Sequence, residues 1–389
     1  MTDASLAERE SAALFHTYDR LAIGAVTHTE GCTIYTEKGA YLDLISGLGV
    51  NALGYSHPGV IRAIEEQAHK YLHLSNLYLQ EPQIVLAEKI KKLSGYDKVF
   101  FCNSGTEAVE GAIKLARKFG APAGKYEVFG LENAFHGRTY GALSLMDKLK
   151  YREGFSPLVE GIRCTSPDAL ESVVSERTAA IILEVIQGEG GIKVVSAQTV
   201  ALLKTLQERY GVLIIADEIQ SGIGRTGTFF AFEKLGLKPD IIVSAKAVGG
   251  GLPLGAIIST DRVAAAFTPG VHGTTFGGNA LSCVAGAVVL EEIENGLMDR
   301  INELSSWFFG RLNELKARFP KTIGEVRGAG LMIGIECVID PKPIHKALLD
   351  RGIITNVTAT NVIRLLPPLV VTKEELESFL EAFEAVVEQ

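Results

Sequence analysis

Side chains suited to covalent chemistry stand directly after short apolar runs in this sequence. Asp217 and Glu218 follow the run VLIIA, and Lys246 follows the next apolar run, DIIVSA. A carboxylate with little water around it is costly unless it meets a cation. A lysine in a dry environment has a lowered pKa, which makes its amine nucleophilic. The pattern indicates amine nucleophile chemistry beside a buried acid, although a plain Asp217–Lys246 ion pair remains an alternative.

A third candidate group is the turn Asn103-Ser104-Gly105-Thr106-Glu107, which follows the apolar run KVFFC and precedes a helical pattern. A small, glycine-containing turn that opens a helix presents free N–H groups and the positive end of the helix dipole, which suits a phosphate. Serine or threonine before glutamate is also the signature of an ordinary helix N-cap. The motif alone leaves both interpretations open.

Positioning these side chains requires a sheet whose strands all end near one edge. Continuous apolar runs, rather than alternating ones, are typical of strands buried on both faces of a mostly parallel sheet. Ligands bind outside the carboxyl ends of such strands. The alternation of these runs with helical patterns predicts an α/β fold layered on both faces. The expected strands are KVFFC (98–102), YEVFG (126–130), AAIILEV (179–185), VLIIADE (212–218), DIIVSA (240–245) and GAIIS (255–259).

Helices are expected at 107–119 and 197–210, where Gly120 and Gly211 are the stop signals. The C-terminal third has a different, α+β character. It shows a long charged helix over 288–319, strand-like runs at 325–338 and 361–371, and a final helix over 373–388. We therefore expect an N-terminal segment (1–50) that joins the small domain, a large domain (51–280) and a smaller α+β domain (281–389).

Composition excludes several classes of protein. The 389 residues carry 38 basic and 46 acidic side chains, a net charge of −8, without the Lys/Arg cluster that a nucleic-acid partner needs. The apolar runs are much shorter than the ~20 residues of a membrane span. The polar, acidic N-terminus does not resemble a signal peptide, so a cytoplasmic location is expected. Five scattered cysteines without a CxxC pair indicate free thiols and no metal site.

A phosphate cradle, a buried acid and a nucleophilic lysine at one sheet edge match the requirements of pyridoxal 5'-phosphate. The aldehyde of this cofactor forms an imine with a lysine, and its pyridine nitrogen needs an acid partner to stay protonated. The protonated ring then acts as an electron sink, while the phosphate needs a helix N-terminus. The sequence predicts this cofactor.

With these features the chain resembles the class III (ω-amino) aminotransferases of pyridoxal-phosphate fold type I, most closely the acetylornithine type. The resemblance runs from TYDR (17–20) to VIRLLPPLV (362–370). It implies a large domain with a mostly parallel seven-stranded sheet between helices, a smaller α+β domain, and a homodimer with shared active sites. Its motifs are NALGYSHP (51–58), FFCNSGTEA (100–108), NAFHGRT (133–139), EVIQGEGG (184–191), ADEIQSGIGRTG (216–227), SAKAVGGGLPLGA (244–256) and HGTTFGGNALS (272–282).

The resemblance implies a role for each matching residue around the cofactor. Lys246 forms the imine and then moves the proton between the substrate carbon and the cofactor. Asp217 pairs with the pyridinium nitrogen, Gln220 lies near the ring hydroxyl, and Phe135 stacks on the ring face. The phosphate is expected at Ser104, Gly105 and Thr106 and, from the neighbouring subunit, at Thr275.

The resemblance also implies how substrates are held. Arg138 and Arg364 match the family's carboxylate-binding arginines, and the arginine fork binds carboxylates with two hydrogen bonds. Judged from the residues alone, a surface salt bridge is the ordinary alternative for either arginine, although Arg364 interrupts an apolar run. Glu189 matches a glutamate that can mask Arg364. Thr274 and Tyr18 are expected near the substrate.

The reaction implied is transfer of the ω-amino group of N2-acetylornithine to 2-oxoglutarate, which gives N-acetylglutamate 5-semialdehyde and glutamate in arginine biosynthesis. Ornithine, succinylornithine, 4-aminobutyrate and carrier-bound lysine are alternative donors, and a racemase or aminomutase is a further possibility on this fold. An inactive scaffold is disfavoured by the complete residue set, and a nicotinamide oxidoreductase by the missing GxGxxG after the first strand. His57 is expected to be a loop or cap residue, and His136 has no assigned role.

Overall fold

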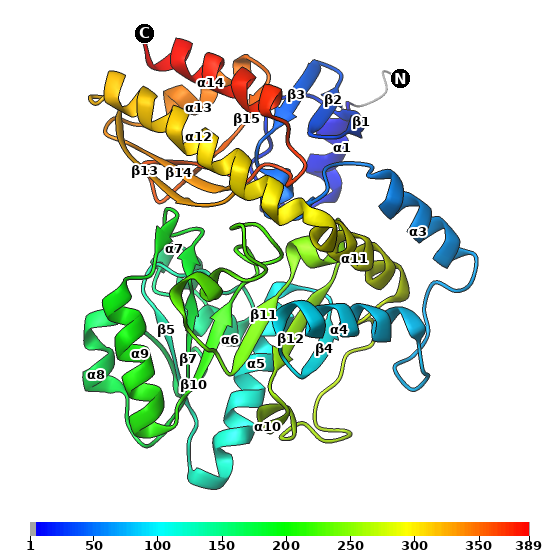
Figure 1. Ribbon diagram of the computed structural model, residues 1–389, viewed down its shortest axis with the longest axis vertical. Helices are drawn as coiled ribbons and strands as arrows, with labels where there is room; N and C mark the ends of the chain where they lie inside the picture. The colour runs from blue at the N-terminus through cyan, green and yellow to red at the C-terminus, as the bar shows by residue number, and fades with distance from the viewer. Residues whose placement is uncertain (1–4, 389) are drawn as a thin grey trace.

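The computed structural model describes residues 5–388, and a seven-stranded sheet dominates its larger part (Figure 1). The strand order is β4-β12-β11-β10-β7-β5-β6. Strand β12 runs antiparallel to both its neighbours, whereas the other pairs are parallel. The predicted mostly parallel seven-stranded sheet is thereby confirmed. Its strands are β4 (Lys98–Cys102), β5 (Glu127–Leu131), β6 (Ile162–Thr165), β7 (Thr178–Glu184), β10 (Leu213–Asp217), β11 (Ile241–Ser244) and β12 (Gly255–Ser259).

Both faces of this sheet are buried, as the continuous apolar runs predicted. Ile181 and Ile214 belong to one core cluster, whereas their neighbours Ile182 and Ile215 belong to a second cluster. Helix α5 (Gly105–Gly120) packs on β7, β11 and β12, and helix α9 (Ala197–Tyr210) lies on the green side of Figure 1 beside β7 and β10. Strand β6 was missed because its short run, IRCT, is interrupted by arginine.

The two glycines predicted to end helices differ in backbone conformation. Gly211 ends α9 in the left-handed region with φ 60°, as expected. Helix α5 also ends at Gly120, as expected, but this glycine is not a left-handed cap. Its φ is −77°, and the chain continues into a short 3₁₀ turn (Ala121–Ala123), which Gly124 ends with φ 71°. A Cβ on Gly120 would come within 2.8 Å of the Cβ of Lys125, so Gly120 permits close packing at the end of the helix.

The long helix expected over 288–319 is also different in the structure. Helix α11 (Ala280–Glu292) begins earlier, a π-helical turn (Ile293–Leu297) with Gly296 at φ 99° follows, and α12 (Met298–Arg318) continues in a new direction. The start was missed because α11 is almost wholly apolar and buried, so it has no amphipathic pattern. A glycine at positive φ accounts for the bend.

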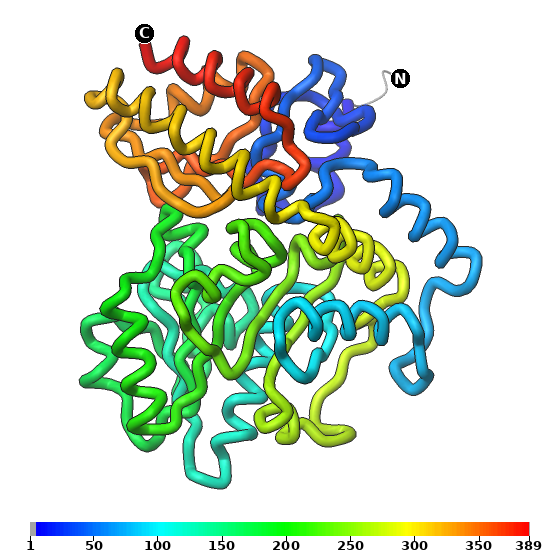
Figure 2. The backbone as a smooth tube through the Cα atoms, in the orientation of Figure 1, coloured from blue at the N-terminus to red at the C-terminus, as the bar shows by residue number. Residues whose placement is uncertain are grey.

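Two smaller sheets form the upper part of Figure 1. One has the antiparallel order β13-β14-β17-β16, with strands β13 (Ile323–Ala329), β14 (Met332–Cys337), β17 (Val362–Leu365) and β16 (Asn356–Thr358). The other joins β1 (Val26–Glu30), β2 (Thr33–Thr36) and β3 (Gly39–Asp43) to β15 (Ile353–Ile354), which pairs parallel with β3. The first strands thus lie beside C-terminal segments, and in Figure 2 the blue and red parts of the tube both lie in the upper part of the molecule.

The exact domain boundaries remain a prediction, and residues 1–4 and 389 of those ranges lie outside the described part.

None of the helices within residues 5–388 combines the length and the apolar character needed to cross a membrane. A short hairpin joins β8 (Ile186–Gln187) and β9 (Lys193–Val194). The remaining helices are α1 (Leu6–Ala13), α2 (Ser46–Gly49), α3 (Pro58–Ala68), α4 (Glu81–Ser94), α6 (Tyr140–Ser144), α7 (Leu149–Arg152), α8 (Leu170–Val173), α10 (Asp261–Ala264), α13 (Lys342–Asp350) and α14 (Lys373–Val387).

Candidate active site

A cavity of about 520 Å³ opens at the carboxyl ends of β4, β7, β10 and β11. This is the sheet edge at which the sequence placed its reactive side chains. The segments that follow these strands, together with the loop 135–138, form the walls. Residues singled out from the sequence that line the cavity are Ser104, Gly105, Thr106, Phe135, Arg138, Glu189, Asp217, Gln220 and Lys246.

The turn after β4 forms one wall. Ser104 is the N-cap of α5, because its Oγ accepts a hydrogen bond from the Glu107 amide at 3.3 Å. The amides of a first helical turn have no partner within the helix, so the same turn also presents donors to an anion in the cavity. A Cβ on Gly105 would lie 2.7 Å from Ile219, so only glycine lets the two segments approach this closely.

Lys246 is half-buried at the start of a 3₁₀ turn (Lys246–Gly249). Its φ of 52° is unusual for a residue with a side chain and costs on the order of 1 kcal/mol. Burial, together with the positive charge of Arg364, lowers the pKa of Lys246 to about 8. A substantial fraction of its amine is therefore neutral, and nucleophilic, near physiological pH.

Asp217 is 3 % exposed and pairs with a histidine. His136 Nδ1 donates to Asp217 Oδ2 at 2.7 Å, and the Ile219 amide donates to Oδ1 at 3.1 Å. Among residues 5–388 Asp217 makes this contact with His136, and not the alternative ion pair with Lys246.

Glu184 belongs to this site but was not singled out from the sequence, and His136, named there without a role, belongs to it too. Glu184 ends β7 directly beside Asp217 in the sheet register, and it accepts hydrogen bonds from the amides of Phe135 (2.6 Å) and Gly188 (2.9 Å). Burial and the charge of Asp217 raise the pKa of Glu184 above its usual value. The rule used for Asp217, a carboxylate that ends an apolar run, would have found Glu184. His136 lies on a loop and gave no comparable signal.

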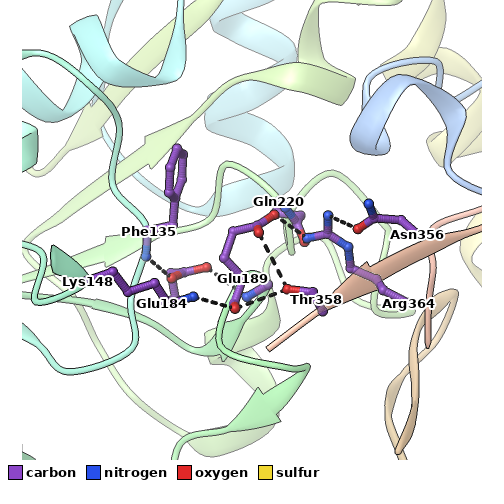
Figure 3. Close-up of polar contacts among 9 residues, drawn as sticks. Phe135, Lys148, Glu184, Glu189, Gln220, Asn356, Thr358 and Arg364 are labelled. Carbon is purple, nitrogen blue, oxygen red and sulfur yellow. Dashed lines mark hydrogen bonds and ion pairs between the residues drawn. The ribbon is translucent and has the colours of Figure 1, made fainter. Parts of the chain in front are cut away.

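Arg364 projects from β17 into a network of polar side chains (Figure 3). Its Nη1 contacts Glu189 Oε1 at 2.7 Å and Gln220 Oε1 at 3.3 Å, while Nη2 donates to Asn356 Oδ1 at 2.6 Å. The side chain is 1 % exposed, so this ion pair is not the surface salt bridge considered as an alternative. Burial opposes ionisation of Glu189, but Arg364, together with Lys246 and Lys148, outweighs burial and lowers the pKa of Glu189.

Arg138 differs from Arg364 in its surroundings. It is exposed at the cavity, and its guanidinium carbon lies 5.9 Å from the ring centre of Phe135 and 5.5 Å from that of Tyr151. Aromatic faces attract a guanidinium without using up its hydrogen-bond donors. The fork of Arg138 is therefore held in place and still able to bind a carboxylate.

Four of the predicted site residues do not line this cavity. One is Arg364, which meets the cavity through Glu189 and Gln220, two residues that do line it. Thr274 lies close to it, because its Oγ1 accepts a hydrogen bond from Asn103 Nδ2 at 3.2 Å. Thr275 is exposed on the surface beside Phe276, and Tyr18 is 61 % exposed. The roles expected for Thr275 and Tyr18 are therefore not assembled within a single chain.

Comparisons with known proteins agree with this geometry. The family described as aminotransferase class-III matches residues 16–387. The acetylornithine aminotransferases of Aquifex aeolicus and Methanocaldococcus jannaschii are 44 % and 42 % identical, over 96 % and 95 % of this chain and 99 % and 94 % of theirs. The ornithine aminotransferase of Toxoplasma gondii, a structure described with partial occupancy of PLP at its active site, superposes with a TM-score of 0.90 at 29 % identity. The superposition covers 98 % of this chain and 93 % of the Toxoplasma gondii chain. This chain belongs to the class III aminotransferases.

Proposed function

We propose that this aminotransferase transfers the ω-amino group of N2-acetylornithine to 2-oxoglutarate and so forms N-acetylglutamate 5-semialdehyde and glutamate, a step of arginine biosynthesis. One observation carries the proposal, the presence of two arginines at the cavity of Lys246. Arg138 lines the cavity and is free to bind a carboxylate, whereas Arg364 lies next to the cavity and is covered by Glu189. Such a site suits both a substrate with one carboxylate near the arginines and a substrate with two. Relatives named for acetylornithine support the choice of donor.

The residues present fit pyridoxal 5'-phosphate, the cofactor of this class. The cavity offers an amine with a lowered pKa, a buried carboxylate, an aromatic ring and the N-terminus of α5. When bound, the cofactor supplies an aldehyde for amines and a protonated ring that withdraws electrons from the reacting carbon. Lys246 would hold the aldehyde, Asp217 would meet the ring nitrogen, Phe135 would lie against the ring, and the turn 104–106 would hold the phosphate.

Each protein group then has a defined task. Lys246 Nζ would take the proton from the substrate carbon that carries the amine and would deliver it to the cofactor. The carboxylate of Asp217, which His136 holds in place, would stabilise the positive charge of the cofactor's ring nitrogen in a site with little water. Arg138 orients the substrate carboxylate, which places the reacting carbon near Lys246. Release of Arg364 from Glu189 would admit the second carboxylate of 2-oxoglutarate.

Removing the guanidinium with Arg138→Met is expected to raise the KM for 2-oxoglutarate about tenfold or more, because a charge-assisted, two-pronged contact is lost. Steady-state kinetics at saturating amine donor measure this. Arg138→Lys keeps the charge but loses the fork, so its KM should lie between those of the wild type and the methionine variant. An unchanged KM in Arg138→Met would remove Arg138 from the substrate site.

The pKa of Lys246 makes a second expectation measurable. Uptake of pyridoxal 5'-phosphate by the cofactor-free protein should speed up with rising pH and level off above about pH 8, because only the neutral amine reacts and its pKa is about 8. Stopped-flow absorbance between about pH 6.5 and 10 follows the reaction. A rate that still rises steeply near pH 10 would show an ordinary lysine and contradict the burial argument.

A homodimer and a cytoplasmic location are part of the same proposal. Apolar side chains gather on one exposed stretch, where Asn76 Nδ2 bonds the backbone of Thr274 (3.2 Å) and of Gly277 (3.1 Å) and so joins two segments. A second copy covering this stretch would place Thr275 near its partner's phosphate site. Sedimentation equilibrium should give twice the chain mass of 41.8 kDa. The exposed apolar residues are Leu72, Leu74, Leu77, Tyr78, Leu79 and Phe276.

The experiment that tests the function is a product assay. Purified protein with its cofactor, N2-acetylornithine and 2-oxoglutarate should form glutamate and semialdehyde in equal amounts. Ornithine, succinylornithine, 4-aminobutyrate and a carrier-bound lysine analogue are compared at equal concentration. A higher kcat/KM for any of these would keep the aminotransferase and change the donor. An amine converted without consumption of 2-oxoglutarate would favour a mutase or racemase.

A further inference from the structure

The backbone carbonyl of Glu189 receives hydrogen bonds from two side chains. Lys148 Nζ donates to this oxygen at 2.7 Å, and Thr358 Oγ1 donates to it at 3.1 Å (Figure 3). Lys148 precedes α7 on the side of the large sheet, whereas Thr358 ends β16 in the C-terminal sheet. The carbonyl is thus held between two parts of the chain that lie far apart in the sequence.

The carboxylate of the same residue is the group that covers Arg364. Its Oε1 lies 2.7 Å from Arg364 Nη1, and its Oε2 lies 3.4 Å from Thr358 Oγ1. A threonine hydroxyl has a single proton, so Thr358 donates to the carbonyl or to the carboxylate. With the carbonyl fixed, Glu189 leaves Arg364 by rotating its side chain, and the loop stays in place.

Glycines flank Glu189 on both sides, and glycine restricts the backbone least. The backbone on either side of Glu189 is nevertheless held. The Gly188 amide donates to Glu184 Oε2 at 2.9 Å, and Arg327 Nε donates to the Gly191 carbonyl at 2.8 Å. Lys148 and Thr358 therefore fix the carbonyl of Glu189 itself, within a loop that is anchored on both sides.

Arg364 does not depend on Glu189 for its own position. Asn356 Oδ1 accepts from its Nη2 at 2.6 Å and Gln220 Oε1 accepts from Nη1 at 3.3 Å. Arg364 therefore stays in place when the Glu189 carboxylate turns away, and it is then ready for a substrate carboxylate. The position of the Glu189 carboxylate thus controls the one ion pair that covers Arg364 among the described residues.

We propose that Lys148 and Thr358 are positioning residues that set how firmly Glu189 covers Arg364. They thereby set the relative affinity of the site for substrates with and without a second carboxylate at this end of the cavity. The proposal rests on the proposed function. A neutral hydrogen bond, such as that of Thr358, contributes about 1 kcal/mol net, and one from an ammonium, such as that of Lys148, contributes more. Each contact therefore shifts this balance by at least about three- to tenfold.

The variants Thr358→Val and Lys148→Met remove one donor each at nearly unchanged volume. The first measurement is calorimetric binding of glutarate, an unreactive diacid, to the protein carrying its cofactor. Each variant should bind glutarate about three- to tenfold more tightly than the wild type, because Arg364 is more readily released. Thr358→Ser keeps the hydroxyl and should restore the wild-type affinity. Unchanged or weaker glutarate binding in both variants would overturn the proposal.

The second measurement separates the two half-reactions by rapid mixing. In both variants the KM for N2-acetylornithine should rise while the KM for 2-oxoglutarate falls or stays the same. A general loss of structure would instead raise both, and Lys150→Met, an exposed neighbour, should change neither. If the wild type reacts with neither substrate, the proposed function fails, and the glutarate titration still decides the role of Lys148 and Thr358.

Discussion

Replacing Lys246 by alanine is expected to lower the rate of transamination at least about 10³-fold, because the site loses both the amine that holds the cofactor and the group that moves the proton. Within residues 5–388, no second amine lines the cavity. The yellow absorption of the lysine-bound cofactor should disappear together with activity. Absorbance spectra and single-turnover kinetics on the same preparation measure the two effects.

The matched control is Lys346→Ala. Lys346 lies on α13 with an exposed side chain paired to Asp350, so its loss removes a lysine without touching the cavity. Its spectrum and rate should equal those of the wild type. A Lys246→Ala protein that keeps the absorption band of the lysine-bound cofactor would show that another lysine carries the cofactor.

Asp217→Asn should have the second-largest effect, a fall in the rate of proton removal of about 10²- to 10³-fold. The substitution conserves size but removes the charge that would keep the ring nitrogen protonated. His136 Nδ1 would then face an amide in place of a carboxylate, in a site where the histidine is 1 % exposed. Single-turnover mixing with the amine donor measures the rate.

Asp261→Asn serves as the control, since that carboxylate is exposed and far from the cavity lining. It should leave the rate and the thermal midpoint unchanged. An Asp217→Asn protein with a near-normal rate would mean that the electron-withdrawing ring does not need this acid, and the charge assignment of the site would be wrong.

The central part of the site was predictable because one rule of α/β folds applies to it. Lys246, Asp217 and the turn 103–107 all follow apolar runs, and parallel strands bring their carboxyl ends to a single edge. Arg364 was recognisable as a charge inside an apolar run, and it proved to be buried beside Glu189. Local sequence is sufficient where position along a strand determines position in space.

Contacts between loops were not predictable in this way. His136 meets Asp217, and Lys148 and Thr358 meet Glu189, across long separations in the sequence and without a repeating pattern. The apolar helix α11 gave no amphipathic signal, and the packing role of Gly120 depends on Lys125 across a turn. Such features follow from the folded arrangement, so they required the structure.

The central claim is that this chain is an aminotransferase with a preference for N2-acetylornithine as donor. The most direct test mixes the purified yellow protein with one amine at a time, without a 2-oxo acid, and follows loss of the cofactor's visible band. The account predicts fast loss with N2-acetylornithine and slow loss with ornithine or 4-aminobutyrate. Faster loss with one of those two would contradict the donor, and no change with any amine would contradict the reaction itself.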